Sequence, residues 1–231
     1  MHDFVNGWNG LMEEAPWVAI FMFIIAPALS IAVFFWGRRW NMGRKRRLLK
    51  YASEIGFTFS SRTIQLKNPP KLVLFQSCHR VKNMMTGSMF GKRIEIFDQE
   101  YSIEKKAGKS LYFARTIFRV EVEGGELPDF VMFPEGFMDR LFWKDIDFAS
   151  APIFSDQYWL NGSDQPRVRR LFNEELLIYF TRNKGLSVEC DGMVLVVYYW
   201  NQTVHAEEMP DFIHTASEVY LMVMRSVDSS S

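Results

Sequence analysis

The sequence predicts an α+β protein, with one N-terminal transmembrane helix followed by a cytoplasmic domain of antiparallel strands with two or three packed helices. Three observations lead to this fold class. Residues 15–36 contain no charged side chain. Apolar residues recur at every second position in several segments before about residue 134, and at a spacing near 3.6 after about residue 163. These are the periods of strands and of helices.

The uncharged stretch is long enough to cross a bilayer. About 20 helical residues cover a hydrocarbon core of about 30 Å. A cleaved signal peptide has a basic start and a shorter apolar core, whereas residues 1–14 carry three acids and no Lys or Arg. We therefore expect a short extracytoplasmic N-terminus at 1–14 and a transmembrane helix at 15–37, in which Pro27 introduces a kink.

The charge that follows the apolar stretch predicts its orientation. Residues 38–50 carry seven basic side chains and no acid, and such clusters stay on the cytoplasmic side. We expect the N-terminus outside and the rest of the chain in the cytoplasm. Six of the basic residues are predicted to lie at the membrane surface, where anionic lipid headgroups attract them: Arg38, Arg39, Arg44, Lys45, Arg46 and Arg47. A topology signal alone explains the same cluster.

A helical stalk is expected at residues 38–56, between the membrane and the domain. Leu48, Leu49, Ala52 and Ile55 recur at steps of three and four, and Gly56 is a natural stop. The α+β domain then occupies residues 57–226, and residues 227–231 form a disordered tail.

Strands are predicted in the first half of the domain. Leu72 to Phe75 is a short apolar run, and Arg93 to Ile96 alternates between polar and apolar residues. Residues 118–123 alternate most clearly, with Gly124-Gly125 ending the run. Residues 130–133 read as a buried strand that ends at Pro134, and residues 136–142 as a short helical turn.

The last third of the domain predicts a helix, a hairpin and a second helix. The first helix, over about 164–180, starts from Ser163 or Asp164 as the cap. Leu186 to Cys190 and Met193 to Tyr198 form the hairpin, because Asp191-Gly192 is a standard two-residue turn. The final helix begins near Pro210 and carries an apolar face.

Composition excludes some classes of function. Residues 51–231 carry 20 basic and 24 acidic side chains, which argues against nucleic-acid binding. The two cysteines, Cys78 and Cys190, lack the spacing of a metal site. We expect them to be thiols in a reducing compartment, and we expect no cofactor.

We recognise no catalytic constellation, so an enzymatic activity is uncertain and a non-enzymatic role is favoured. Two acid pairs come closest to a site: Asp98 with Glu100, just past a strand end, and Asp145 with Asp147 in a loop. Residues i and i+2 of an extended segment face the same side, so either pair could hold a cation. Asp98 and Glu100 are the candidate metal ligands, although solvated loop acids are the ordinary explanation.

Aromatic residues suggest an interaction surface. Of residues 51–231, 27 are Phe, Tyr or Trp, and Tyr and Trp often anchor protein contacts. The interaction candidates are Trp143, Tyr158, Trp159, Tyr199 and Trp200. Burial in the core is the alternative for each ring.

Several short motifs together resemble a known pattern. They are Gly56-Phe57, Gly87, Ile96-Phe97-Asp98 with Tyr101, Thr116, Leu127-Pro128-Asp129-Phe130, Pro134-Glu135 and Phe154-Ser155. Over most of residues 44–225 the chain thus resembles uncharacterised bacterial proteins that place one such domain behind one or two membrane helices. The resemblance implies a bacterial inner-membrane protein with a mixed α/β domain, and it implies no catalytic residues.

The sequence therefore favours a membrane-anchored accessory or scaffold protein that presents a cytoplasmic α+β interaction domain to a protein partner in or at the membrane. The alternative is a membrane-associated enzyme or a ligand or metal sensor built around Asp98 and Glu100. A third hypothesis is a lipid-regulated switch that depends on Arg44 to Arg47 and the anionic lipid surface.

Overall fold

The computed structural model describes residues 21–65, 72, 80–105, 109–122, 127–136 and 145–228. The chain divides into two compact units, one up to Arg46 and one from Arg47 onward. A π-helix, η1 (Phe21–Ile25), leads directly into α3 (Ala26–Glu54). Within the described ranges, no helix combines the length and the apolar character that crossing a bilayer requires. Residues 1–20, which include the expected N-terminus and the start of the expected span, lie outside these ranges.

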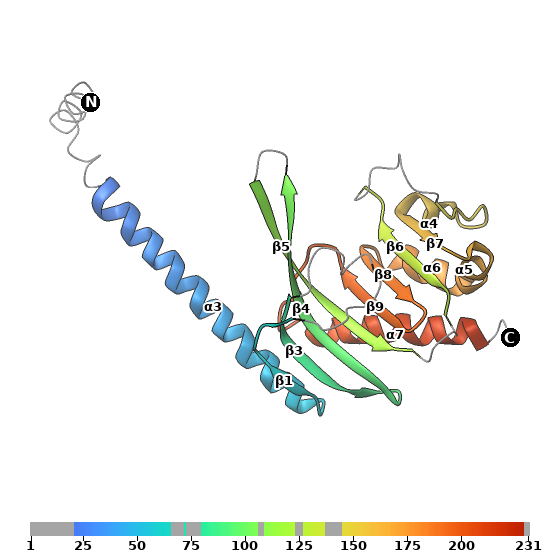
Figure 1. Ribbon diagram of the computed structural model, residues 1–231, viewed down its shortest axis with the longest axis horizontal. Coiled ribbons are helices and arrows are strands. Elements are labelled where there is room, and N and C mark those ends of the chain that lie inside the picture. The colour runs from blue at the N-terminus through green and yellow to red at the C-terminus, as the bar shows by residue number, and fades with distance from the viewer. Residues whose placement is uncertain are drawn as a thin grey trace, which may run out of the picture. The chain divides into compact units, whose positions relative to one another are not determined.

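The second unit is built on an antiparallel sheet. Its strands are β1 (Thr58–Ser60), β2 (Ile64–Gln65), β3 (Arg80–Met89), β4 (Lys92–Lys105), β5 (Lys109–Glu121), β6 (Asp129–Pro134), β7 (Tyr158–Gly162), β8 (Leu186–Asp191) and β9 (Val194–Tyr199). The order in the sheet is β1-β3-β4-β5-β9-β8-β6-β7 (Figure 1). Strand β2 pairs with β3. This architecture confirms the predicted α+β class with antiparallel strands.

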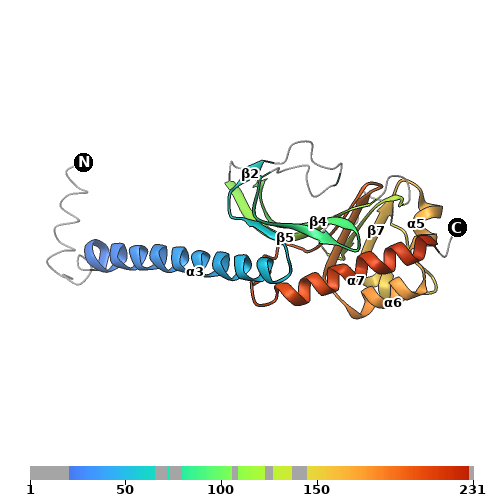
Figure 2. The same ribbon diagram turned by 90° about the horizontal axis from the view of Figure 1, so that it is seen from below.

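Four further helices alternate with the later strands along the chain: α4 (Pro152–Gln157), α5 (Gln165–Leu171), α6 (Glu174–Arg182) and α7 (Met209–Asp228). Figure 2 shows α6 and α7 on the same side of the sheet. The main core lies on this side. It joins Leu48 and Ala52 of α3 to strand residues such as Ile96 and Phe118 and to helix residues such as Phe180.

The opposite face of the sheet carries a second cluster of buried side chains. Phe97, Ile117 and Val196 belong to it, and Phe133 and Trp159 stack within it with ring centroids 6.1 Å apart. Side chains along a strand alternate between the two faces. In β4, Ile96 therefore joins the helix-covered core and its neighbour Phe97 joins this second cluster.

The alternating segments formed strands as predicted. Ile94 pairs with Val120 and Glu95 with Arg119 in the register of β4 and β5. The carboxylate of Glu95 is nearly buried and forms ion pairs of 2.7 Å with Arg93 and with Arg119. The polar face of this strand pair is thus partly covered, and its charges compensate one another.

Phe57 and Gly87, two positions of the resemblance, touch in the structure. A Cβ atom placed on Gly87 would lie 2.2 Å from Cδ1 of the Phe57 ring. That distance is far inside van der Waals contact, so only glycine lets β3 approach the buried ring. Close packing gives these two motif positions a physical reason.

The C-terminal hairpin and final helix were also predicted correctly. The connection lies one position later than predicted: Gly192 and Met193 connect β8, which ends at Asp191, to β9, and Gly192 has a φ of +81°. Helix α7 begins one residue before Pro210. The stalk helix forms the end of α3, and Gly56 at a φ of +75° follows its last turn.

The predicted helix over 164–180 is wrong as a single element, because it is two helices. Asp164 caps α5, where its side chain accepts a hydrogen bond from Arg167 N. The extended backbone of Asn173 then starts α6, and its side chain accepts from Leu176 N at 3.0 Å. A second cap inside the window ends one helix and starts another.

Four strands and one helix of the domain were not predicted: β1, β2, β3, β7 and α4. Tyr158 and Trp159, expected in a loop, lie in β7, which pairs with β6. Of the expected strand at 72–75, Leu72 alone is described, and it is not in a strand. Residues 78, 123–126 and 137–144, with Cys78, Gly124-Gly125 and most of the expected turn at 136–142, lie outside the described ranges.

Candidate functional site

Helix α6 forms one wall of a groove on the helix-covered side of the domain. Its apolar stripe, Leu176, Leu177 and Phe180, is buried in the core. Ile178 does not belong to that stripe, and its side chain is 43% exposed. Tyr179 is half-buried beside it. The core-facing stripe thus fixes α6, and its opposite side offers apolar surface to solvent.

Helix α7 forms the other wall. Its buried face includes Phe212, Ala216 and Val219. Leu221 is 39% exposed, whereas its neighbour Met222 is almost completely buried. Two helices therefore each leave one aliphatic side chain uncovered next to the same groove.

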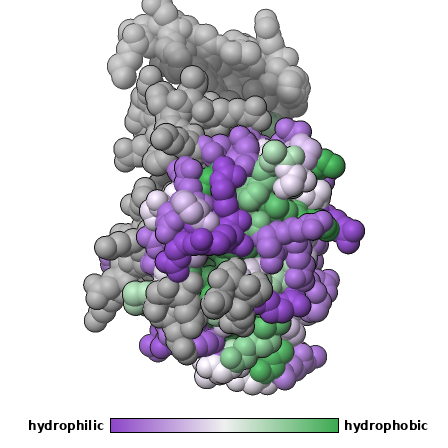
Figure 3. Space-filling view, turned by 90° about the vertical axis from the view of Figure 1, so that its right-hand side faces the viewer, coloured by the Kyte–Doolittle hydropathy of each residue, from purple (hydrophilic) through white to green (hydrophobic). Residues whose placement is uncertain are grey.

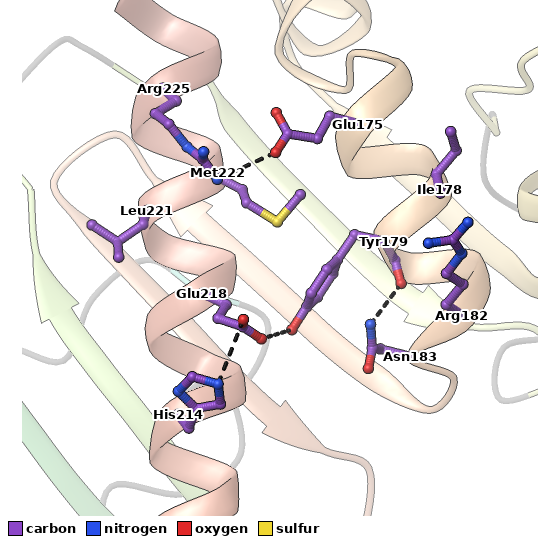
Figure 4. A pocket seen from close by; sticks show the side chains of 10 residues that line it. All are labelled: Glu175, Ile178, Tyr179, Arg182, Asn183, His214, Glu218, Leu221, Met222 and Arg225. Carbon is purple, nitrogen blue, oxygen red and sulfur yellow. Dashed lines mark hydrogen bonds and ion pairs between the residues drawn. The ribbon is translucent and has the colours of Figure 1, made fainter.

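The open groove has a volume of about 830 Å³. Its lining consists of Glu175, Ile178, Tyr179, Arg182, Asn183, His214, Glu218, Leu221, Met222 and Arg225. Figure 4 shows Tyr179 and Met222 between the two helices, with Ile178 on the outer side of α6 and Leu221 on the outer side of α7. The site is a shallow saddle with apolar shoulders.

Polar contacts tie the two walls together. The hydroxyl of Tyr179 donates to the Glu218 carboxylate at 3.1 Å, and Arg225 forms an ion pair of 3.2 Å with Glu175 (Figure 4). Beyond the groove, Asn173 Nδ2 donates to Ser226 Oγ at 2.9 Å. Residue numbers rise along α6 as they fall along α7, so the helices run antiparallel.

Among the charged side chains of the groove, Arg182 differs from the others in its surroundings. Burial raises the pKa of Tyr179, and the adjacent Glu218 carboxylate raises it further, so Tyr179 is a neutral donor. His214 Nε2 lies 3.5 Å from Glu218 Oε1. Arg182 is exposed and forms no hydrogen bond or ion pair with any residue that the structure describes. The groove offers one open guanidinium beside apolar surface.

This arrangement can bind a partner surface. The lining combines the exposed aliphatic side chains of Ile178 and Leu221 with the protonated Tyr179 hydroxyl. Apolar surface with a few placed polar groups is typical of a recognition site. Figure 3 shows apolar patches, in green, separated by hydrophilic side chains, in purple, on one face of the molecule.

The acid pair predicted from sequence has structural partners. Asp98 is 2% exposed, and its carboxylate accepts from Asn83 Nδ2 at 2.7 Å and from Thr116 Oγ1 at 2.8 Å. Glu100 is half-exposed and bonds to Lys82. Within the described ranges no three His, Cys, Asp or Glu side chains gather as metal ligands.

The second acid pair is also divided. Asp145 Oδ1 accepts from Leu160 N at 2.9 Å and so holds the preceding loop against β7. Burial raises the pKa of Asp145, although its backbone hydrogen bond from Leu160 opposes the rise. Asp147 is exposed.

The predicted interaction aromatics fall into two groups. Tyr158 and Trp159 are interior side chains, 1% and 7% exposed. Tyr199 and Trp200 are half-buried at the end of β9. Trp143 lies outside the described ranges. None of the four described residues lines the groove between α6 and α7.

The predicted membrane-surface residues lie on α3. Arg39 and Arg46 are exposed, and Arg44 and Lys45 are partly covered. Arg47, at the start of the second unit, forms an ion pair with Glu207. The side chain of Arg38 is outside the described set.

A buried polar cluster was missed by sequence reasoning. The Arg115 guanidinium lies 4.3 Å from the ring centroid of Tyr101 and 4.9 Å from that of Tyr198. Arg115 Nε donates to Gln99, and the Tyr198 hydroxyl donates to Glu189 at 2.7 Å. Burial and the Glu189 carboxylate raise the pKa of Tyr198. Cation–π contacts and hydrogen bonds together compensate these buried charges.

The residues of the groove were also missed. Ile178 and Leu221 lie off the apolar stripe of their helices, and that is the only sequence signal they give. Large apolar residues on the polar side of an amphipathic helix are candidates for contacts beyond the core.

Comparison with known proteins gives one kind of likeness. The sequence matches no protein family and no curated protein. In three dimensions the chain is similar to the crystal structure of the mycobacterial trehalose monomycolate transport factor A, TtfA. The TM-score is 0.56 at 16% sequence identity, and the alignment covers 80% of this chain and 96% of that chain. The two proteins share a fold.

Proposed function

We propose that this protein is a membrane-anchored accessory or scaffold subunit whose α+β domain binds a protein partner in or at the membrane. In this proposal the anchor is the apolar stretch at 15–37 of a bacterial inner-membrane protein. The N-terminus lies outside, the domain lies in the cytoplasm, and the basic residues after the anchor contact anionic lipid headgroups.

The observation that carries the proposal is the surface of α3 before its basic segment. Val33, Phe34 and Phe35 are each more than 60% exposed, and Leu29 and Ile31 are more than half exposed; Ile24, in the preceding η1, is 63% exposed. An exposed apolar surface of this extent needs a partner such as lipid or another helix.

The fold shared with TtfA supports the proposed accessory role. That protein is described as a transport factor, which is compatible with an accessory role in a membrane process. The groove between α6 and α7 supports partner binding by the domain.

Membrane anchoring is tested by charge insertion. Arg at both Ile25 and Leu29 places two charges near the middle of the proposed span, each costing about 3 kcal/mol there. The native chain is expected to stay in the membrane pellet after alkaline carbonate washing, and the double Arg variant to leave it. Ile25→Leu with Leu29→Ile is the matched control. Release of the native chain by carbonate would overturn the proposal.

Orientation has its own test. A C-terminal tag on the full-length chain is expected to resist protease in intact spheroplasts and to be digested in inverted vesicles. Digestion in intact spheroplasts would place the domain outside and contradict the topology.

The accessory role is tested by chemical cross-linking in native membranes, with purification of the tagged full-length chain and mass spectrometry. One stoichiometric partner is the expected result. A chain recovered alone, or cross-linked to itself only, would overturn the accessory role and leave the anchor unaffected.

A further inference from the structure

We propose that the groove between α6 and α7 binds an amphipathic helix of the partner protein, with an acidic side chain of that helix opposite Arg182. This inference rests on the proposed function, because it names the surface and the chemistry through which the accessory domain recognises its partner.

The groove is organised before any partner binds. Two polar contacts join its walls, Glu175 to Arg225 and Tyr179 to Glu218, and beyond the groove the hydrogen bond from Asn173 to Ser226 also links the two helices. Both helices are also fixed by their buried stripes. A partner therefore meets a preformed surface, and little of the binding free energy is lost to ordering it.

The dimensions of the saddle fit a helix. Along α7 the lining runs from His214 to Arg225, which is about 16 Å at 1.5 Å per residue, or about three turns. Apolar shoulders on both sides, Ile178 and Leu221, flank the centre at Met222. Helix-in-groove recognition uses apolar side chains at i, i+3 or i+4 and i+7, a set that covers a similar length.

The polar contacts across the groove argue against an extended lipid chain as the occupant. An acyl chain needs a continuous apolar channel. Here the Glu175–Arg225 pair and the Tyr179–Glu218 hydrogen bond cross from wall to wall. These polar contacts divide the apolar surface of the groove into separate patches, and separate patches suit the spaced apolar side chains of a helix.

Charge complementarity predicts the sign of the charge that the partner places opposite Arg182. Within the groove, Glu175 is compensated by Arg225, and Glu218 accepts from Tyr179 and lies near His214. The exposed Arg182 has no counterion in the described part of the chain. An acidic side chain on the occupant completes this pattern.

The test places a photo-crosslinking amino acid, p-benzoylphenylalanine, at position 221 of the full-length chain in native membranes. The same amino acid at position 153 is the matched control, because Ile153 is also an exposed aliphatic residue but lies on α4. The expected product forms at position 221 and not at 153. Its cross-linked peptide belongs to the partner found by chemical cross-linking, and its sequence is amphipathic and contains an acid.

Charge reversal then tests Arg182. Arg182→Glu is expected to lower the cross-linking yield at position 221 roughly tenfold, and changing the partner's acid to Lys is expected to restore it. Lys184→Glu, an exposed change just beyond α6, is the control and should leave the yield unchanged. An unchanged melting temperature of Arg182→Glu shows that the groove remains folded.

Several results would overturn the inference. These are cross-links from position 221 to lipid, to a second copy of this chain or to a non-helical peptide, or an Arg182→Glu variant with full yield. If the partner is still recovered by chemical cross-linking while position 221 gives no product, the groove is wrong and the accessory role stands. If no partner is recovered by either method, the proposed function fails as well.

Discussion

Asp98 shows how a residue that looks like a ligand can be a structural acceptor. Its buried carboxylate receives hydrogen bonds from Asn83 and Thr116, and Thr116 Oγ1 in turn accepts from Val204 N at 2.9 Å. This series of hydrogen bonds links β3, β4 and β5 to the segment before α7. Asp98 lies within β4, not just past a strand end as predicted, and it holds four parts of the fold together.

This role predicts a large loss of stability when Asp98 is removed. Asp98→Ala leaves buried donors without an acceptor, and we expect the free energy of unfolding to fall by about 3 kcal/mol. Glu100→Ala removes a half-exposed pair with Lys82 and should cost less than about 1 kcal/mol. Urea denaturation of the full-length chain in detergent measures both. A stabilisation of the native chain by a divalent cation, lost in Asp98→Ala, would instead favour the metal-sensor hypothesis.

Cys190 predicts a pH dependence. Burial raises the pKa of its thiol from 9.0 to about 12, so the folded state favours the neutral form. The resulting stabilisation is complete below the unfolded-state pKa and is lost as the pH rises from about 9 to about 12. We expect iodoacetamide to leave Cys190 unmodified at pH 8.5 and to modify it in denaturant, as read by peptide mass mapping. Rapid labelling of the folded chain would contradict this burial.

For the helices and strands, local sequence patterns predicted those elements that form through local interactions. The hairpin at 186–199 follows from alternation and from Asp191-Gly192, and the strands at 93–96 and 118–122 follow from their period of two. The break inside 164–180 was not visible, because Phe172 and Leu176 continue the helical spacing across it. The helical spacing is interrupted at Asn173, which caps α6, and the spacing of apolar residues does not reveal a cap.

Asn173 accordingly has two separable functions. Its side chain caps α6 by accepting from Leu176 N, and it links α6 to α7 by donating to Ser226. Asn173→Ala loses both and should lower the free energy of unfolding by about 2 kcal/mol. Asn173→Asp keeps the acceptor, so about half of that loss should return. Thermal melts of the three proteins measure this, and equal losses in both variants would show that the cap contributes little.

Strand β7 and the groove were beyond sequence reasoning for a different reason. The pairing of β7 with β6 joins residues about 30 positions apart, and Tyr158 and Trp159 become interior only through it. Ile178 and Leu221 become neighbours of one groove only when α6 packs beside α7. Such properties depend on tertiary placement, whereas the sequence reports the preference of each segment separately.

For the whole molecule, the division near Arg46 predicts a protease-resistant fragment. The compact second unit starts at Arg47, directly after the basic residues 44–46. Brief trypsin treatment of the full-length protein is expected to cleave in this basic segment and to leave a fragment that extends to the C-terminal region. Its mass and a single cooperative thermal transition would support independent folding of this unit. Cleavage throughout residues 145–228 on the same timescale would contradict it.

The order of the strands also matters while the chain is being made. Strands β8 and β9 are the last to be synthesised, yet they lie in the middle of the sheet and connect β5 to β6. At about 5 to 20 residues per second, several seconds separate the emergence of β6 from that of β9. During that interval β5 and β6 present unpaired edges. Nascent chains, and any product of a premature stop before residue 186, are thus expected to depend on chaperones and to be cleared by proteolysis.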